Sequence, residues 1–493
     1  MPDAAVKKSG GASLRRLFSV LTATVVLCAP RFFVPTAPRR GAIDWNSSPV
    51  LGLGGGGGGG NAEQDGGGAA VLDNQVHSPC SSMPNHTICC DRSDRNTDVC
   101  FMAGDVRTDA ESLSLLLFPP RAPAPGAAVE ERIRPYSRKW EHPVMARIPE
   151  VWLRLAPPEE AAGGRRCDVR HDAPVLVIAA GPYTGNLFHA FNDGFLPSWL
   201  TVQHLRRRVV LAVLRYKPWW SVRFREIISG LSDYPVIDLL GDKRTHCFPG
   251  AIVGTRFHGF LAVDHTRLRD NKTIVDFHRF LAGVHETQDA ISKQPEITQQ
   301  PTQRRWRPRL GIVSRKGTRV IENQAAVAQL AASVGFDVDI LETPADETPL
   351  SAVHAAVSAC DALVGVHGAD LTTFLFLRPG RAALAQIAPL GIDDISRDFF
   401  GTPAARMGLH YEQYDVRGHE SSLSREYPPD HVVMADPEKA KRAKGWDFTA
   451  RVYLNGQNVT LDLARFRETL ARMHSLLQRQ QGNHPTSKAL PEI

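Results

Sequence analysis

The sequence predicts an α/β protein with two domains, each built from short parallel strands joined by crossover helices. Two alternating series of strands and helices predict this, one within residues 173–240 and the other within 310–387. A polar linker rich in Gln, Pro and Arg, residues 287–309, separates the two series. Two such domains predict a cleft between them, where ligands commonly bind.

The first series begins with an apolar run, residues 173–181, that is typical of a buried strand. Further strands are expected at 209–214 and 236–240, with a helix around 223–229 between them. Another strand, 113–118, precedes Pro119 and Pro120. This alternation predicts a Rossmann-like arrangement for the first domain.

The second series is longer and more regular. Strands are expected at 310–314, 336–341, 362–366 and 383–387, and helices at 325–334, 349–359 and 371–377. Residues 461–478 predict an amphipathic C-terminal helix, with the apolar face Leu463, Phe466, Leu470, Met473 and Leu477. We expect the segment 415–446 to be an exposed excursion.

The N-terminus predicts attachment to a membrane. Basic residues precede an apolar run, 17–29, that continues through 32–34. We expect a cytosolic tail (1–16), a signal anchor (17–34) and a Pro- and Gly-rich stem (35–79), followed by domains at 80–295 and 296–493. A cleaved signal peptide is the alternative, but no small-x-small cleavage site follows the apolar run.

Two further features indicate that the folded part of the chain, the lumenal body, lies in the lumen of the secretory pathway. Four N-x-S/T sequons occur, at Asn46, Asn85, Asn271 and Asn458. The chain has 8 cysteines, and the odd number that remains outside the anchor leaves at least one unpaired within the chain. The sequence contains no C-x-x-C pair, so it predicts no zinc site. Which cysteines pair with one another stays open.

The charge and the motifs exclude several function classes. Lys and Arg number 58 against 52 Asp and Glu, but they are spread along the chain without a basic stripe. We therefore expect no nucleic-acid partner, and an anionic small substrate explains the balance as well. The sequence contains no P-loop, G-x-S-x-G elbow or metalloprotease motif.

His189 and Asp193 are the candidate catalytic pair of the first domain. They are four residues apart in GNLFHAFNDG, so on a helix they share a face. A carboxylate that accepts from an imidazole fixes its tautomer and raises its basicity, which suits a general base. The preceding strand ends at Gly181, which places the pair at the carboxyl edge of the sheet. A polar pair that only stabilises a turn is the alternative.

Two stretches of the second domain predict an anion site. In GVHGADLTTFLFLRPG a strand, a Gly-containing turn and an apolar helix-like run place backbone N–H groups beside His367 and Gly368. In SRKGTR, Arg315, Lys316 and Arg319 follow another strand, and guanidinium groups match phosphate oxygens. An ordinary βα turn and a solvated basic loop are the alternatives.

A D-x-D pattern, Asp337-Val338-Asp339, is of the kind that holds a divalent metal in some sugar-nucleotide enzymes. It lies within the strand expected at 336–341, after a Gly that ends a helix. We therefore interpret it as a strand with outward-facing carboxylates and predict no metal site.

Taken together, several segments resemble a plant member of glycosyltransferase family 61. This family includes xylan arabinosyl- and xylosyltransferases and the N-glycan core β-1,2-xylosyltransferase. The resembling segments occur in the family's order and span most of the chain from Cys90 to Tyr414. They are CDRSDRNTDVC with GDVR, GPYTGNLFHAFNDGFLP, SRKGTR, GVHGADLTTFLFLRPG and QIAPLG.

The resemblance implies a GT-B fold, a single-pass type II protein of the Golgi membrane, and an inverting, metal-independent transfer from a UDP-sugar. The donor would carry a pentose, arabinofuranose or xylose, and the acceptor would be xylan or an N-glycan; a Golgi enzyme complex is a further partner that the family allows. A non-catalytic polysaccharide-binding or scaffold protein with the same fold is the alternative from another class.

Carried over by position, the resemblance assigns the diphosphate to Arg315, Arg319, His367 and Gly368, with Asp370 and Thr372 in the same donor site. His189 is the candidate base, oriented by Asp193, and Asp193 itself is the fallback. Asp370 and Thr373 depart from the HGAGLTN that many relatives carry. A carboxylate that points at a diphosphate would repel it. Asp370 is therefore expected to contact sugar hydroxyls or to act on the acceptor, which leaves the identity of the donor open but not the reaction class.

Overall fold

The structure is a computed structural model, and it describes residues 72–119, 130–157, 165–285, 306–342 and 348–482. The predicted tail, anchor, most of the stem, the domain boundary at 295/296 and Asn46 lie outside the described residues. Among the residues that are described, no helix is both long enough and apolar enough to span a membrane.

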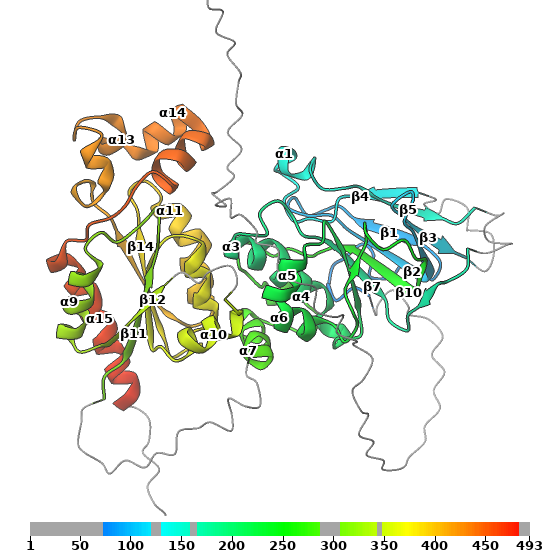
Figure 1. Cartoon of the computed structure of the whole chain (residues 1–493), viewed down its shortest axis with the longest axis horizontal. Helices are drawn as coiled ribbons and strands as arrows, with labels where there is room; N and C mark the ends of the chain where they lie inside the picture. The colour runs from blue at the N-terminus through cyan, green and yellow to red at the C-terminus, as the bar shows by residue number, and fades with distance from the viewer. Residues whose placement is uncertain (1–71, 120–129, 158–164, 286–305, 343–347, 483–493) are drawn as a thin grey trace, which may run out of the picture. The chain divides into compact units, whose positions relative to one another are not determined.

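Among the described residues, the first sheet has ten strands and mixes parallel with antiparallel pairs (Figure 1). Its main order is β4-β5-β3-β2-β10-β7-β8-β9, with β1 paired to β2 and β6 to β10. Three neighbouring pairs of this sheet are parallel, namely β10 with β7, β7 with β8, and β8 with β9. The bounds are β1 (Ile88–Asp91), β2 (Val99–Asp109), β3 (Ser114–Phe118), β4 (Glu130–Ile133), β5 (Val151–Leu155), β6 (Val169–Arg170), β7 (Val175–Ala179), β8 (Val210–Leu214), β9 (Ile237–Asp238) and β10 (His246–Gly254).

A purely Rossmann-like first domain is therefore wrong. The parallel part is present, but β2 runs antiparallel to β10 and to β3 and extends the sheet. The sequence of β10 did not indicate a strand because Pro249 interrupts it. Proline lacks the N–H that a ladder needs, and the register shifts between Phe248 and Gly250.

The helices of the first domain follow the parallel strands. One continuous helical stretch after β7 comprises α3 (Leu187–His189), the π-helical η1 (Ala190–Phe195) and α4 (Leu196–Val202). The remaining helices are α1 (His142–Met145), η2 (Gln203–Leu205), α5 (Pro218–Arg223), α6 (Arg225–Leu231), η3 (His265–Arg267) and α7 (Ile274–His285).

The second sheet is parallel throughout, in the order β12-β11-β13-β14-β15. Helices α9 (Gln324–Val334) and α15 (Leu463–Gly482) cover one face, and α10 (Leu350–Ser358) lies on the other (Figure 1). The alternation of strands and helices that the sequence predicted for the second domain is therefore confirmed. The strands are β11 (Arg309–Ser314), β12 (Asp337–Glu342), β13 (Ala362–Val366), β14 (Ala383–Ala388) and β15 (His410–Asp415).

Sequence reasoning missed β15, because its residues HYEQYD are mostly polar and show no buried run. Between β13 and β15 lie η4 (Ala369–Phe376), α11 (Asp393–Ser396), η5 (Arg397–Gly401) and α12 (Thr402–Arg406). The helix expected at 371–377 is a 3₁₀ helix that begins two residues earlier.

The segment 415–446 is not simply an exposed excursion. It contains η6 (Gly418–Glu420), η7 (Ser422–Arg425), α13 (Val432–Ala435) and most of α14 (Pro437–Thr449), and η8 (Ala450–Leu454) follows. Leu423, Val433 and Ala440 are buried in a small core that also includes Ile392 and residues of the helices that follow, such as Phe448. Four apolar residues of the C-terminal helix are buried as predicted, but Leu463 is 37% exposed.

The described cysteines form three disulfides, Cys80–Cys89, Cys90–Cys100 and Cys167–Cys247. Cys360 is free and buried. The expectation of one unpaired cysteine outside the anchor is therefore confirmed, and the pairing that the sequence left open is now defined.

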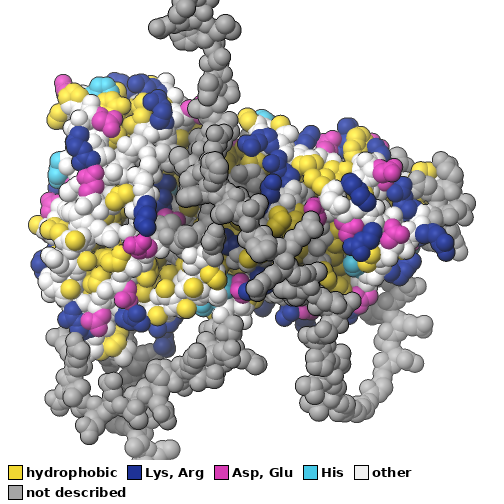
Figure 2. Space-filling view, viewed as in Figure 1, with side chains coloured by type: hydrophobic (Ala, Val, Ile, Leu, Met, Phe, Trp, Pro, Cys, Tyr) yellow, Lys and Arg dark blue, Asp and Glu magenta, His cyan; other side chains and the backbone are white. Residues whose placement is uncertain are grey.

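Charged side chains are distributed evenly over the surface that Figure 2 shows. Lys and Arg lie among Asp and Glu on that face, without gathering into one patch. This agrees with the spread of basic residues along the sequence.

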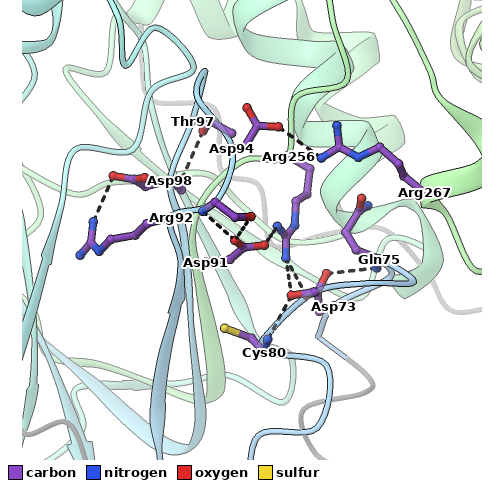
Figure 3. Close-up of polar contacts among 12 residues, drawn as sticks. Asp73, Gln75, Cys80, Asp91, Arg92, Asp94, Thr97, Asp98, Arg256 and Arg267 are labelled. Carbon is purple, nitrogen blue, oxygen red and sulfur yellow. Dashed lines mark hydrogen bonds and ion pairs between the residues drawn. The ribbon is translucent and has the colours of Figure 1, made fainter.

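The folded body begins earlier than predicted, because Arg256 ties the last residues of the expected stem to the first sheet (Figure 3). Its Nη2 donates to Asp73 Oδ2 at 2.6 Å and to Ser78 Oγ at 2.9 Å, and its Nη1 donates to Asp91. Arg256 and both carboxylates are buried. Residues 72–79 thus belong to the body, since this guanidinium compensates their buried polar groups.

Replacing Arg256 should destabilise this region strongly. Arg256→Met leaves two buried carboxylates unpaired, so the free energy of unfolding should fall by about 3–5 kcal/mol. Arg92→Met is the control, because Arg92 pairs with Asp98 and Glu131 at a side chain that is 40% exposed and should cost at most about 1 kcal/mol. Urea unfolding followed by circular dichroism measures both. Equal losses for the two variants would contradict this account.

Two buried histidines should make the fold sensitive to acid. The rings of His285 and His354 lie 5.1 Å apart between centroids. Burial lowers the pKa of each to about 4, and for His285 the neighbouring His354 adds to the effect. Neither ring nitrogen of His285 has a hydrogen-bond partner among the described residues.

Between pH 6.5 and about 4 the unfolded chain binds protons that the folded chain does not. Stability should therefore fall as the pH falls through this window, by about 1.4 kcal/mol per pH unit for each such histidine. In His285→Phe, the slope of the unfolding free energy against pH should decrease by about the contribution of one histidine. In His142→Phe, at an exposed position, that slope should stay unchanged. Unfolding free energies between pH 4 and 7 test this, and an unchanged slope in His285→Phe would contradict it.

Candidate active site

His189 and Asp193 contact each other as predicted. His189 Nδ1 lies 2.8 Å from Asp193 Oδ2. His189 ends α3 and Asp193 lies in the π-helical η1, where the helix is wider than an α-helix. π-Helical turns of this kind often occur at functional sites.

Sequence reasoning missed Arg138, which completes this cluster. Its Nε donates to Asp193 Oδ2 at 2.8 Å and its Nη2 to Asp193 Oδ1 at 3.2 Å. Nη2 also lies 3.0 Å from His189 Nδ1, and Nη1 donates to Glu141. Arg138 is 51 residues before His189, in a segment without clear periodicity. No local pattern could have paired them.

Asp193 is held as a buried carboxylate. Burial acts to raise its pKa, but His189 and Arg138 outweigh it and lower the pKa to about 2. Tyr136 Oη and Asn192 Nδ2 also donate to it, at 3.0 and 2.7 Å. A carboxylate with this many donors is a weak base, and its role is to hold charge and orientation.

His189 is the more accessible member of the pair. Its side chain is 20% exposed and its ring stacks on Tyr183, with centroids 4.5 Å apart. When Nδ1 donates to Asp193, Nε2 carries the free lone pair of the ring. The cluster can therefore accept a proton at Nε2 and stabilise the resulting imidazolium through Asp193.

The second domain brings Arg315, Arg319 and Gly368 together. A Cβ atom on Gly368 would lie 2.8 Å from Arg315 Nη1 and 3.2 Å from Arg319 Nη1, so only glycine leaves room for both guanidinium groups. Arg319 Nη1 donates to the carbonyl of His367 at 3.3 Å. Burial and the neighbouring Arg315 lower the pKa of Arg319 to about 10, so the Arg319 guanidinium remains cationic at neutral pH.

His367 is buried and neutral. Burial, with Arg319 and Arg315 close by, lowers its pKa to about 3. Tyr411 Oη donates to Gln386 Oε1 at 2.7 Å, and Gln386 Nε2 donates to His367 Nδ1 at 3.0 Å. In this series of hydrogen bonds Nδ1 is the acceptor, so the ring hydrogen is on Nε2. His367 can therefore donate a hydrogen bond without adding charge.

The other predicted donor residues lie at the same turn. Asp370 forms an ion pair with Arg315, so its carboxylate is partly neutralised there. Thr372 is buried, and its hydroxyl has no partner among the described residues. Lys316 instead contacts Glu342 at 3.0 Å on the exposed side of the loop. Contacts thus join Arg315, Arg319, His367, Gly368 and Asp370 at this turn, and Thr372 lies in the same 3₁₀ helix as Asp370.

Aromatic rings join the two clusters. Phe188 packs beside His189 and stacks on Phe399 with centroids 5.1 Å apart. Phe399 and Phe400 lie 6.2 and 5.2 Å from the ring of His367. The helix α3 also contacts η4. The structure thus connects the candidate base to the candidate anion site through one layer of rings.

The D-x-D pattern is a strand with outward carboxylates, as interpreted. Asp337 and Asp339 lie on β12, where they pair with Arg307 and Arg309 at 2.8 Å. Within the described ranges, no group of three or more His, Cys, Asp or Glu side chains has a metal-binding arrangement.

The described sequons differ in exposure. Asn85 and Asn271 are exposed. Asn458 is half-buried, and its side-chain oxygen accepts from the backbone N–H of Val320 at 3.1 Å. Asn85 and Asn271 are therefore the more accessible positions for a glycan.

Comparison with known proteins identifies the family. The Glycosyltransferase 61 profile matches residues 187–384. The xylan glycosyltransferase MUCI21 of Arabidopsis thaliana is 37% identical over 406 residues, which cover 81% of this chain and 82% of the relative. The beta-1,2-xylosyltransferase XYXT1 of Oryza sativa subsp. japonica is 34% identical over 410 residues, 80% and 86% of the two chains.

The alpha-1,3-arabinosyltransferase XAT3 of Oryza sativa subsp. japonica is 35% identical over 391 residues, 77% of this chain and 64% of the relative. The matched region contains both His189 with Asp193 and the turn at Gly368. The chain belongs to glycosyltransferase family 61 and is a glycosyltransferase.

Proposed function

We propose that this enzyme transfers a pentose, arabinofuranose or xylose, from a UDP-sugar to xylan, with inversion at the anomeric carbon. The relatives named above support xylan as the acceptor. The proposal includes a GT-B arrangement and a type II Golgi membrane protein with a lumenal body, as the sequence predicted.

The observation that carries the proposal is the pairing of the Arg138–Asp193–His189 cluster with the cationic turn at Gly368. One cluster presents a base whose conjugate acid is stabilised. The other presents two guanidinium groups at a glycine, with a neutral histidine beside them. A sugar transfer needs both functions, one at the attacking hydroxyl and one at the leaving diphosphate.

In the proposed reaction His189 Nε2 removes the proton of an acceptor hydroxyl. The oxygen then attacks the anomeric carbon, and the bond from that carbon to the diphosphate oxygen breaks with its electron pair on UDP. Arg315 and Arg319 stabilise the charge that develops on the diphosphate. Because one base acts in a single displacement, the anomeric configuration inverts.

Asp193 and Arg138 act on His189 and not on the substrate. Asp193 stabilises the imidazolium that forms, and His189 and Arg138 together hold the pKa of Asp193 at about 2, so its carboxylate is ionised at physiological pH. The guanidinium groups supply the positive charge that a divalent metal supplies in other sugar transfers. We therefore propose a metal-independent transfer, and addition of EDTA should leave the rate unchanged.

The test is a donor screen with the lumenal body. UDP-xylose and UDP-arabinofuranose are each incubated with xylan oligosaccharides and, separately, with N-glycan acceptors, and UDP release is measured. We expect release from one donor that depends on the acceptor. Release only with N-glycan acceptors would favour an N-glycan xylosyltransferase. Binding of xylan without release from either donor would favour the scaffold alternative.

A further inference from the structure

We infer that Trp140 is the stacking platform that holds a sugar ring of the acceptor polysaccharide beside His189. The inference rests on the proposed function, since it assigns the acceptor side of the same site. A pyranose ring presents an apolar C–H face and a rim of hydroxyl groups. A flat aromatic side chain at the surface matches that face.

Exposure alone does not single out Trp140. It is 40% exposed, while Trp219 and Trp446 are 44% and 61% exposed. Isolated exposed apolar residues are common on protein surfaces and need no function. What distinguishes Trp140 among these three is its connection to the candidate base.

That connection is a single guanidinium group. Arg138 lies over the Trp140 ring, with its Cζ 5.5 Å from the ring centroid. The same guanidinium lies 5.4 Å from the ring centre of Tyr183, which stacks on His189. It also contacts Asp193 and His189 directly. Trp140 is therefore separated from the base by one side chain.

Trp140 also begins a series of aromatic contacts that ends at the donor side. The centroid of its ring lies 6.5 Å from that of Phe257, and the centroids of Phe257 and Phe260 lie 6.3 Å apart. Phe260 contacts Phe399 at 4.3 Å, and Phe399 lies 6.2 Å from His367. Phe260 and Phe399 are half-buried. An acceptor on Trp140 would therefore lie beside rings that continue toward the candidate diphosphate turn.

The surroundings favour a neutral sugar over a charged ligand. Arg138, the cation nearest the ring, is neutralised by Asp193 and Glu141. Lys139 pairs with Asp98 at 2.7 Å. Glu141 accepts from Tyr183 Oη at 3.2 Å. By contrast, the guanidinium groups of Arg132 and Arg154 both lie over the ring of Trp152, with Cζ 4.8 and 4.1 Å from its centroid, so two cations surround that ring.

The experiment compares Trp140→Ala, Trp140→Phe, Trp219→Ala and Trp446→Ala with the unchanged enzyme. Binding of xylohexaose without donor is measured by calorimetry, and the KM for xylohexaose is measured by UDP release. We expect Trp140→Ala to weaken binding and raise the acceptor KM about tenfold or more, with an unchanged Kd for UDP. Trp140→Phe should recover most of the loss, and the other two variants should match the unchanged enzyme.

A Trp140→Ala variant within twofold of the unchanged enzyme would overturn the inference, as would an equal loss in Trp219→Ala or Trp446→Ala. So would a fall in kcat without a rise in the acceptor KM, because that result would make Trp140 a support for Arg138 only. The proposed function can fail while this inference holds. That would be the result if xylohexaose binds through Trp140 but the unchanged enzyme releases no UDP from either pentose donor.

Discussion

His189→Ala should abolish sugar transfer while leaving UDP binding intact. Removing the imidazole removes the group that accepts the acceptor's proton, so kcat should fall by about 10²–10⁴-fold. UDP should bind as before, because the diphosphate contacts we propose lie on Arg315 and Arg319. Steady-state UDP release gives kcat, and calorimetry with UDP gives the affinity.

Two further variants make this result specific. Asp193→Asn keeps the shape of the cluster but removes the carboxylate that stabilises the imidazolium, so kcat should also fall by orders of magnitude. His142→Ala, at an exposed histidine outside the cluster, should keep full activity. A His189→Ala variant that turns over normally, or that loses UDP affinity, would remove His189 from the role of base.

Arg315→Ala should have the second largest effect, on UDP affinity. The variant loses charge-assisted hydrogen bonds to the diphosphate, which contribute about 1.5–3 kcal/mol. It also removes the ion pair between Arg315 and Asp370, so the Asp370 carboxylate is less neutralised and repels an anion more strongly. Together these effects should weaken UDP binding by a factor of about 10–100, as calorimetry can measure.

The chain offers a matched control and a rescue. Lys316→Ala removes the adjacent cation, but Lys316 contacts Glu342 on the exposed side, so UDP affinity should hardly change. Arg315→Ala combined with Asp370→Asn should recover part of the loss, since the repelling carboxylate is gone. Equal losses in Lys316→Ala and Arg315→Ala would contradict the assignment of the diphosphate site.

The second sheet and its site could be predicted from the sequence because their signals are local. The strands β11, β13 and β14 are largely apolar runs, and Arg315, His367 and Gly368 directly follow two of them. The carboxyl ends of parallel strands meet at one edge of a sheet, so residues at those ends are neighbours by topology. The one strand that was missed, β15, has a polar sequence.

The antiparallel part of the first sheet and the role of Arg138 could not be predicted, because both depend on long-range pairing. β2 pairs with β10, which is more than 130 residues later, and Pro249 obscures the pattern of β10. Arg138 reaches Asp193 from a segment of irregular structure. Periodicity describes only near neighbours in the chain, so it carries no information on which distant segment will supply the guanidinium.

The configuration of the anomeric carbon in the first product tests the central claim most directly. The enzyme is incubated with the active UDP-pentose and a xylan oligosaccharide, and the coupling constant of the new anomeric proton is measured by NMR. A single displacement activated by His189 predicts a product of the opposite configuration to the donor. A product that retains the donor's configuration would contradict it, because retention is not the outcome of one direct attack by a deprotonated hydroxyl.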